Sequence, residues 1–474
     1  MDQTYCGDLI FNNIKYKFDF RNNVLVIIPD ELEDYTKWHF KNIGSKDKFE
    51  RVNVEGTTNN GFYICFIHVK FSHMGRGILQ AFVPGYVICK ANGVSPLPKC
   101  EEISKIRFFG ECLDRFYYPK RIIKTSDFFQ SNDIILELNK NKLKTDNFII
   151  NKDVFKFGVA WKIPFSSNIN VVLDVESFLE IEFNTKQNID EIVEYYLKVK
   201  KFFSFINNRK YIKFNKVTAY TTIPVNYGIK RDDIRNEEFK FEFHFVDPDE
   251  KYDLDKANNS IHLEDLDNKF SKIYKLVTNK DFLTEYYPLS ISDNNYVDND
   301  KYVNVARAFE SEFDKLYPKF KAKTSEEYNA VKKALLKCLS NKKNNANLAI
   351  KKEKDIKYNK KIIKECNYFN KIISKMEGSL SEKVTYSLRK YKEIISNKKK
   401  LMLNNYQITK IKDGVLADKF KERRNAISHG SSANAFTDIE VIVYELVRMC
   451  IYCITLERCK MSEEKIDNIV SKIF

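Results

Sequence analysis

The chain has 474 residues, a formal net charge of +15 and a hydrophobic content of 43%, with 37 Phe and 27 Tyr. This content excludes a disordered chain, and the length exceeds one ordinary core, so we expect two or three folded parts. The first six residues lack a signal-like pattern, and the apolar run at residues 441–456 is interrupted by Glu445 and Arg448. We therefore expect neither a secretory signal nor a membrane span. Ten scattered Cys without framework spacing favour reduced thiols and a cytoplasmic protein.

The first half of the chain has the pattern of a β-rich region. Residues 14–20 and 239–245 alternate apolar with polar side chains, which is the period of a half-buried strand. Further strands, separated by Asn, Gly and Pro, are expected at residues 61–72, 78–90, 105–110, 133–138, 179–183 and 211–220. One helix is expected near residues 189–205, where an apolar stripe is made of Ile192, Tyr196, Val199 and Phe203.

The pattern changes near residues 247–250 and is almost wholly helical from about Leu266. We therefore predict the α+β class, with a β-rich N-terminal domain over residues 1–250, with room for two lobes, and an all-α helical bundle over residues 260–474. Helices are expected at residues 302–317 and 379–395. A last long helix follows the capping-box sequence at residues 437–440.

Positive charge is concentrated between residues 341 and 400, where 18 Lys or Arg stand against 6 Asp or Glu. Such a concentration is expected of a surface that meets phosphate backbones. The alternative is a solvated helix face in a chain that is rich in Lys and Asn throughout. The candidate RNA-binding lysines are Lys351, Lys352, Lys360, Lys361, Lys398, Lys399 and Lys400.

A helix with an unusual end is expected at residues 416–430. Leu416, Phe420 and Ile427 form its apolar face, and Gly430 can end it in a left-handed conformation. The opposite side is therefore free to carry polar chemistry.

Three side chains near the end of this helix suit RNA cleavage without a metal or another cofactor. His429 can exchange protons with a ribose 2′-OH or a leaving 5′-oxygen, Arg424 can hold the phosphate, and Asn425 can orient either group. Asn425 and His429 lie within about 40° on a helical wheel, whereas Arg424 and His429 are about 140° apart. Arg423 also satisfies the spacing but lies on the apolar side, as a packing or ion-pair residue. The alternative for the whole motif is a charged helix end whose His caps the carbonyl groups.

The remaining patterns give weaker indications of a functional site. Glu310 could support the motif arginine, although a solvated surface glutamate is favoured. Cys450 and Cys453 match C-x-x-C inside an apolar stripe, which favours core packing over zinc. The acidic run at residues 293–300 lacks the glycine and glutamate of a calcium loop, and the other histidines stand singly, so we predict no metal site.

Residues 424–429 resemble the R-N-x-x-x-H signature of HEPN ribonucleases, and as in that family they precede a long C-terminal helix. The resemblance covers roughly residues 266–474. It implies catalytic roles for Arg424, Asn425 and His429, with 2′,3′-cyclic phosphate and 5′-hydroxyl products. It also implies a homodimer, or a higher even oligomer, whose two chains share the active site.

The β-rich half followed by such a domain is similar to the ApeA-like abortive phage infection proteins, in stretches such as residues 103–110 and 180–183. This resemblance implies an antiviral ribonuclease that cuts cellular RNA, with tRNA as the expected substrate. The N-terminal domain would sense a phage protein, for which capsid protein is a candidate. Two alternatives stay open: a non-catalytic RNA- or protein-binding module, and a HEPN toxin restrained by a separate antitoxin.

Overall fold

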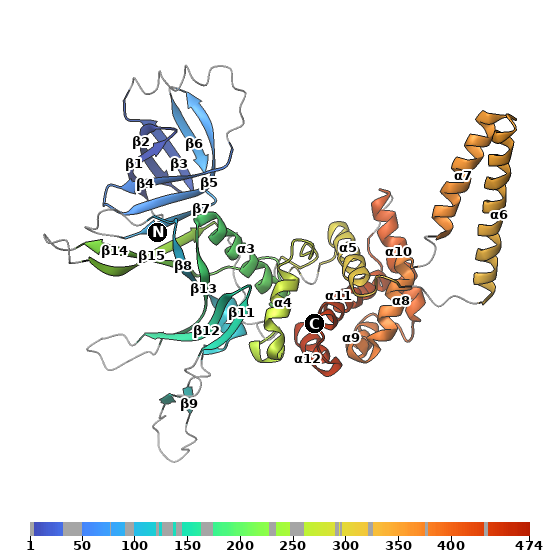
Figure 1. The fold of residues 1–474 in the computed structure, drawn as a ribbon. Helices are drawn as coiled ribbons and strands as arrows, with labels where there is room; N and C mark the ends of the chain where they lie inside the picture. Colours follow the sequence, from blue (N-terminus) through green and yellow to red (C-terminus); the bar gives the residue numbers. More distant parts are fainter. Residues whose placement is uncertain are drawn as a thin grey trace, which may run out of the picture. The chain divides into compact units, whose positions relative to one another are not determined.

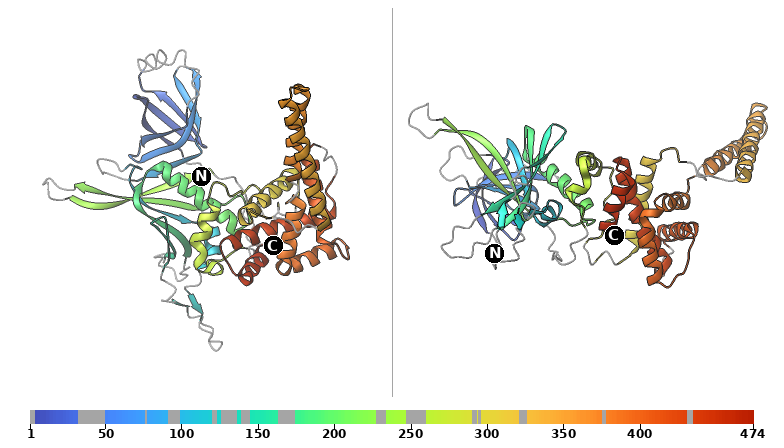
Figure 2. Two further views of the ribbon diagram at one scale, coloured as in Figure 1. Left: turned by 45° about the vertical axis from the view of Figure 1, so that its right-hand side comes forward. Right: turned by 90° about the horizontal axis from the view of Figure 1, so that it is seen from below.

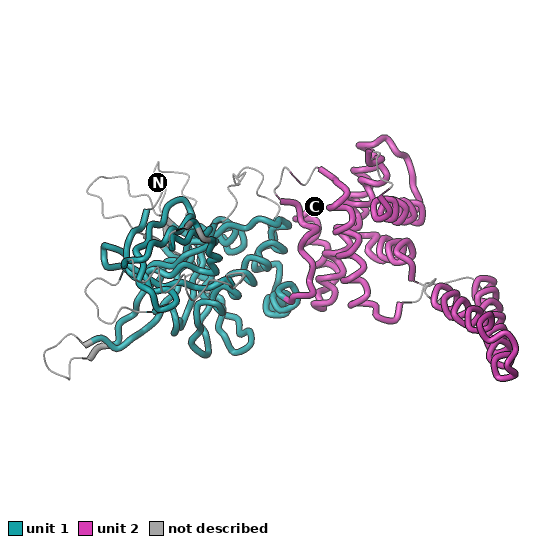
Figure 3. Tube along the Cα trace, turned by 90° about the horizontal axis from the view of Figure 1, so that it is seen from above, with its two compact units in different colours: residues 1–278 teal, residues 279–474 magenta. Residues whose placement is uncertain are grey.

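The chain divides into two compact units, residues 1–278 and 279–474, in the computed structural model (Figure 3). The first contains the strands and the second is helical, which confirms the α+β class. The described residues are 4–31, 50–75, 77–90, 99–119, 123–125, 136–138, 145–162, 174–226, 234–246, 260–289, 293, 296–320, 326–374, 378–430 and 435–474. Residues 133–135 and the change of pattern at residues 247–250 lie outside them.

Unit 1 is built mainly of antiparallel strands (Figure 1). Its strands are β1 (Tyr5–Phe11), β2 (Ile14–Arg21), β3 (Val24–Pro29), β4 (Val52–Thr58), β5 (Tyr63–Gly75), β6 (Ile78–Phe82), β7 (Gly85–Cys89), β8 (Ile103–Phe109), β9 (Ile123–Thr125), β10 (Leu136–Leu138), β11 (Asp146–Ile150), β12 (Asp153–Lys162), β13 (Asp174–Gln187), β14 (Lys216–Asn226) and β15 (Ile234–Phe245). Its helices are α2 (Glu111–Phe116), α3 (Ile189–Ile206), η4 (Leu263–Lys269) and α4 (Phe270–Val277). The run expected at residues 78–90 is two strands, β6 and β7, with Pro84 between them.

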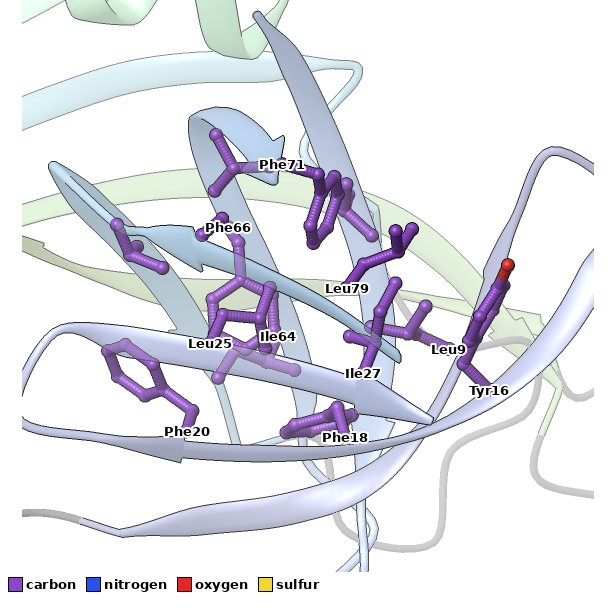
Figure 4. Close-up of a cluster of buried hydrophobic side chains, with 14 of the residues drawn as sticks. Leu9, Tyr16, Phe18, Phe20, Leu25, Ile27, Ile64, Phe66, Phe71 and Leu79 are labelled. Atoms are coloured by element: carbon purple, nitrogen blue, oxygen red, sulfur yellow. The ribbon is translucent and has the colours of Figure 1, made fainter. Parts of the chain in front are cut away.

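Six strands close on themselves in the order β5-β4-β1-β2-β3-β6, because β6 pairs again with β5. The alternation predicted for residues 14–20 is confirmed in β2, whose apolar side chains are buried while Lys15 and Lys17 are exposed. Tight turns between the strands use Asn12, Asn13 and the pair at residues 22–23, all with positive φ. The closed sheet surrounds one core, whose residues include Leu9, Tyr16, Phe18, Phe20, Leu25, Ile27, Ile64, Phe66, Phe71 and Leu79 (Figure 4).

The other large sheet is open, with the order β11-β12-β13-β8-β14-β15-β7. It is joined to the closed sheet by β5, because residues 63–67 of that strand pair with β7 whereas residues 70–75 pair with β6. Between these two stretches His68 has a φ of 51°. A strand that passes between sheets requires a bend of this kind.

One face of the open sheet is covered by α3 and α4 (Figure 2). Tyr196 of α3 stacks on Phe245 at 3.8 Å between ring centroids. Phe270 of α4 contacts Phe148 at 4.6 Å and Phe157 at 5.2 Å. The sequence pattern predicts residues 260–278 as the start of the helical part, but they lie with the strands, because their aromatic side chains complete the core of the sheet.

Unit 2 is helical. Its helices are α5 (Asn299–Leu316), α6 (Glu326–Lys351), α7 (Ile356–Ser374), α8 (Leu380–Lys390), α9 (Lys392–Asn405), α10 (Asp413–Ser428), α11 (Asp438–Arg458) and α12 (Glu463–Ile473). The buried helix α11 contacts α5, α8, α9, α10 and α12, whereas α6 and α7 pair as a hairpin. None of the described helices offers an apolar stretch of the length that a bilayer crossing requires.

Two predictions about helix ends have different outcomes. The capping box before α11 is confirmed, since Thr437 Oγ1 accepts from the Glu440 backbone N–H and Glu440 accepts from that of Thr437. The single helix expected at residues 379–395 is wrong. The chain breaks at Tyr391, whose hydroxyl donates to Glu457 of α11 at 2.6 Å, while the neighbouring Lys390 pairs with the same carboxylate. These tertiary contacts outweigh the continuous helical pattern of the sequence.

Candidate active site

Helix α10 carries the predicted motif and is held by its apolar side. Leu416 and Phe420 are fully buried, and the Phe420 ring lies 4.9 Å from that of Tyr302 of α5. Ile427 is half-buried. The helix ends as expected, because Gly430 has a φ of 73° and donates its N–H to Ile427 O. This packing leaves the Asn425 and His429 side of α10 turned away from the core.

Arg424 is bound by two neighbours. Its Nη2 lies 3.4 Å from Glu310 Oε2 of α5, and its Nη1 donates to Asn425 Oδ1 at 3.2 Å. The side chains of Arg424 and Glu310 are 33% and 31% exposed, so the pair sits at the rim of the bundle. The sequence favoured a solvated Glu310, whereas the structure brings this carboxylate to the motif arginine. A contact between residues 114 positions apart leaves no signal in local periodicity.

His429 lies at the exposed end of α10. Its backbone N–H donates to Asn425 O at 3.0 Å. Its imidazole forms no hydrogen bond with any other described residue. The alternative interpretation of the motif, a histidine that caps the last carbonyl groups of the helix, requires such a contact, and it is not seen among these residues. The ring is accessible for proton exchange with a bound molecule.

Arg423 has a different environment from the next residue. It is buried, and its guanidinium carbon lies 4.1 Å from the centroid of the Phe436 ring. Such a stacked arginine stabilises packing through a cation–π contact. Its place on the apolar side agrees with the packing role predicted for it, and Arg424 is the arginine that faces solvent.

The seven candidate RNA-binding lysines fall into two groups. Lys399 donates to Asp413 of α10 at 2.6 Å, and Lys398 donates to the carbonyl oxygen of Phe474. These two cations are engaged inside unit 2 and hold α9 in place. The five that remain exposed are Lys351, Lys352, Lys360, Lys361 and Lys400.

No group of three or more His, Cys, Asp or Glu residues is arranged to hold a metal ion in the part of the chain that the structure describes. Cys450 and Cys453 are buried in α11, and burial raises the pKa of both thiols. In the acidic run at residues 293–300, of which residues 294–295 lie outside the described residues, the Lys301 ammonium donates to Asp293 Oδ1 at 2.6 Å and to Tyr296 O at 2.8 Å. The Lys301 ammonium therefore occupies the oxygens of Asp293 and Tyr296.

Of the motif residues, His429 is exposed, and Arg424 and Asn425 are half-buried. Cavities of about 510 Å³ in unit 1 and about 460 Å³ in unit 2 are lined by other residues. An arginine held by a carboxylate, beside an amide and an accessible imidazole, can bind a phosphate and move protons. Comparisons of the chain with protein-family models, curated proteins and solved structures find no match.

Proposed function

We propose that the chain is a metal-independent endoribonuclease of the HEPN type. The observation that carries this proposal is the contact of Arg424 with Glu310 and Asn425, on the helix whose end presents the accessible His429. The motif stands directly before α11, as the resemblance of residues 424–429 requires.

The proposed reaction uses each side chain in one role. Arg424 binds the non-bridging oxygens of the scissile phosphate and stabilises the charge that grows on them, while Glu310 fixes the guanidinium. His429 accepts the proton of the ribose 2′-OH, the 2′-oxygen attacks phosphorus, and the bond to the 5′-oxygen breaks. That oxygen takes up a proton, which leaves a 2′,3′-cyclic phosphate and a 5′-hydroxyl.

The direction of the side chains supports a site shared by two copies of the chain. Arg424 lies at the edge of the buried face beside α5, whereas His429 lies about 140° further around the helix. One copy converges poorly on a single phosphate. A homodimer, or a higher even oligomer, would set Arg424 of one copy against His429 of the other and supply a second imidazole as general acid.

The biological role is proposed from the resemblance to ApeA-like proteins. Unit 1 would sense a phage protein, with capsid protein as a candidate, and the nuclease would then cut cellular RNA such as tRNA in the cytoplasm. The rival functions are a non-catalytic RNA- or protein-binding module and a toxin restrained by a separate antitoxin.

The test is induced expression of wild type, His429→Ala and the matched control Ser428→Ala in a bacterial host, with and without phage. Ser428 is exposed and adjacent to the motif histidine. Discrete RNA fragments with cyclic-phosphate ends are expected from wild type and Ser428→Ala alone. Cleavage that needs phage supports the sensor role, and cleavage without phage supports the toxin. Intact RNA in all three strains under phage challenge would refute the nuclease.

A further inference from the structure

The hairpin of α6 and α7 carries a concentrated charge at one end. Its tip, defined here as residues 339–365, has nine Lys against three acidic residues. Eight of the nine lysines are exposed, and none of the nine forms an ion pair with another described residue. Elsewhere in unit 2, Lys301, Lys383 and Lys399 are each paired with an Asp at 2.6 Å. The charge of the tip is thus uncompensated, which favours an anionic partner.

Four of these lysines form one stripe. Lys357, Lys360, Lys361 and Lys364 recur at i, i+3, i+4 and i+7 on α7. The opposite side of the helix carries the buried Cys366 and packs on α6. Over residues 357–364 the apolar side is used within the hairpin, and the exposed apolar side chains Tyr368, Phe369 and Ile372 lie beyond the stripe, toward the C-terminal end of α7. The stripe itself therefore lacks the continuous apolar face that insertion into a membrane surface requires. A polyanion that follows a line of cations fits it better.

An aromatic ring stands beside the stripe. Tyr358 is 65% exposed, and its neighbour one turn further along the helix surface is Lys361, at i+3. Tyr368, on the same helix, is 59% exposed, whereas Tyr302 and Tyr444 of unit 2 are buried. An exposed aromatic side chain among lysines can stack on an unpaired base while the lysines bind phosphates.

We propose that the tip of the α6–α7 hairpin binds single-stranded RNA, with the lysine stripe on the phosphates and a base stacked on Tyr358. The choice of RNA as the polyanion rests on the proposed function of unit 2. The hairpin would capture the substrate, and the α10 motif would cut it, so binding and cleavage would depend on different residues.

The test measures binding of a labelled 20-nucleotide single-stranded RNA of mixed sequence, and of its duplex, by fluorescence anisotropy. The full chain carries His429→Ala, so that no RNA is cut. In the stripe variant, Lys357, Lys360, Lys361 and Lys364 become Gln. In the matched control the same change is made at four exposed lysines outside the hairpin, Lys210, Lys272, Lys275 and Lys280.

The stripe variant should bind RNA on the order of 100-fold more weakly at about 0.15 M salt. The slope of log K against the logarithm of the salt concentration should also become shallower by about 3, since each lost phosphate contact removes about 0.7 from it. Tyr358→Leu should weaken binding of the single strand about five-fold or more and leave the duplex unchanged. An equal loss in the matched control would overturn the proposal. So would binding to vesicles of anionic phospholipid without binding to RNA.

These outcomes separate the hairpin from the catalytic proposal. If the stripe variant loses RNA while the chain with an intact His429 leaves RNA uncut, the hairpin proposal stands and the nuclease proposal fails. If cleavage occurs and the stripe variant binds RNA as tightly as its parent, the nuclease stands and the hairpin proposal fails.

Discussion

Replacing Glu310 by Gln should weaken catalysis more than folding. Glu310 Oε2 lies 3.4 Å from Arg424 Nη2, and both side chains are about one-third exposed. Ion pairs of this exposure contribute about 0.2–1 kcal/mol, so the free energy of unfolding should fall by less than about 1 kcal/mol. Removing a group that stabilises transition-state charge costs about 100- to 1,000-fold in rate, which we expect for Arg424→Ala. Glu310→Gln only loosens that group, and we expect a loss of about ten-fold.

The assay is single-turnover cleavage of an end-labelled RNA by wild type, Glu310→Gln, Arg424→Ala and the double variant. If Glu310 acts through Arg424, its replacement has no further effect once the arginine is absent. A full ten-fold loss in the Arg424→Ala background would refute this reasoning and assign Glu310 a direct contact with RNA. The control is Glu422→Gln, which changes an exposed carboxylate of α10 that pairs with Lys419. It should cleave as wild type does.

Three further predictions concern folding and reactivity. Glu312 is 2% exposed and pairs with Arg458 and Lys315, which are partly exposed, so Glu312→Gln should lower the stability of the helical unit by about 1–3 kcal/mol, measured by urea unfolding followed by circular dichroism. Burial raises the pKa of Asp114 to about 6, so its contribution to stability is complete below about pH 4 and is lost as the pH rises through 6. Asp114→Asn should therefore become more stable relative to wild type between pH 4 and 7, as reported by the fluorescence of the two tryptophans, which both belong to unit 1. Of the ten cysteines only Cys338 is exposed, so one thiol should react rapidly with a maleimide in the native protein, and Cys338→Ala should remove it.

Each of these three has a contrary result. Unchanged urea unfolding of Glu312→Gln would mean that its cations are satisfied by water. A stability difference for Asp114→Asn that stays constant with pH would show that the carboxyl ionises normally in the folded state. Several fast thiols would mean that the cores open readily.

Much of the fold could be predicted because it depends on local patterns. The strand at residues 14–20 and the helix after Thr437 follow from side-chain alternation and from a capping sequence of four residues. The break at Tyr391 could not be predicted, because it depends on Glu457, a residue far away in the sequence. Closure of the six-stranded sheet likewise depends on pairing between β5 and β6, which alternation alone does not specify.

The candidate site divides in the same way. The direction of Asn425 and His429 follows from the period of α10, and the structure agrees with it. The partner of Arg424 comes from another helix, and composition alone made a solvated Glu310 the favoured interpretation. Lys398 and Lys399 differ from their prediction in the opposite way. The run of lysines predicts exposed cations, but these two are bonded to other residues of unit 2.

The strand β5 has a consequence for how unit 1 can be divided. Its residues 63–67 pair with β7 of the open sheet on one side and run beside β4 of the closed sheet on the other, and its residues 70–75 pair with β6, so the two sheets form one continuous ladder of hydrogen bonds. A gene fragment that ends near Phe82 would lack β7 and expose an unpaired edge of apolar residues around Ile64. Such an edge pairs with other chains and promotes aggregation. Unit 1 should therefore be expressed only as a whole. A functional test of the N-terminal half should delete all of unit 1 rather than one of its sheets.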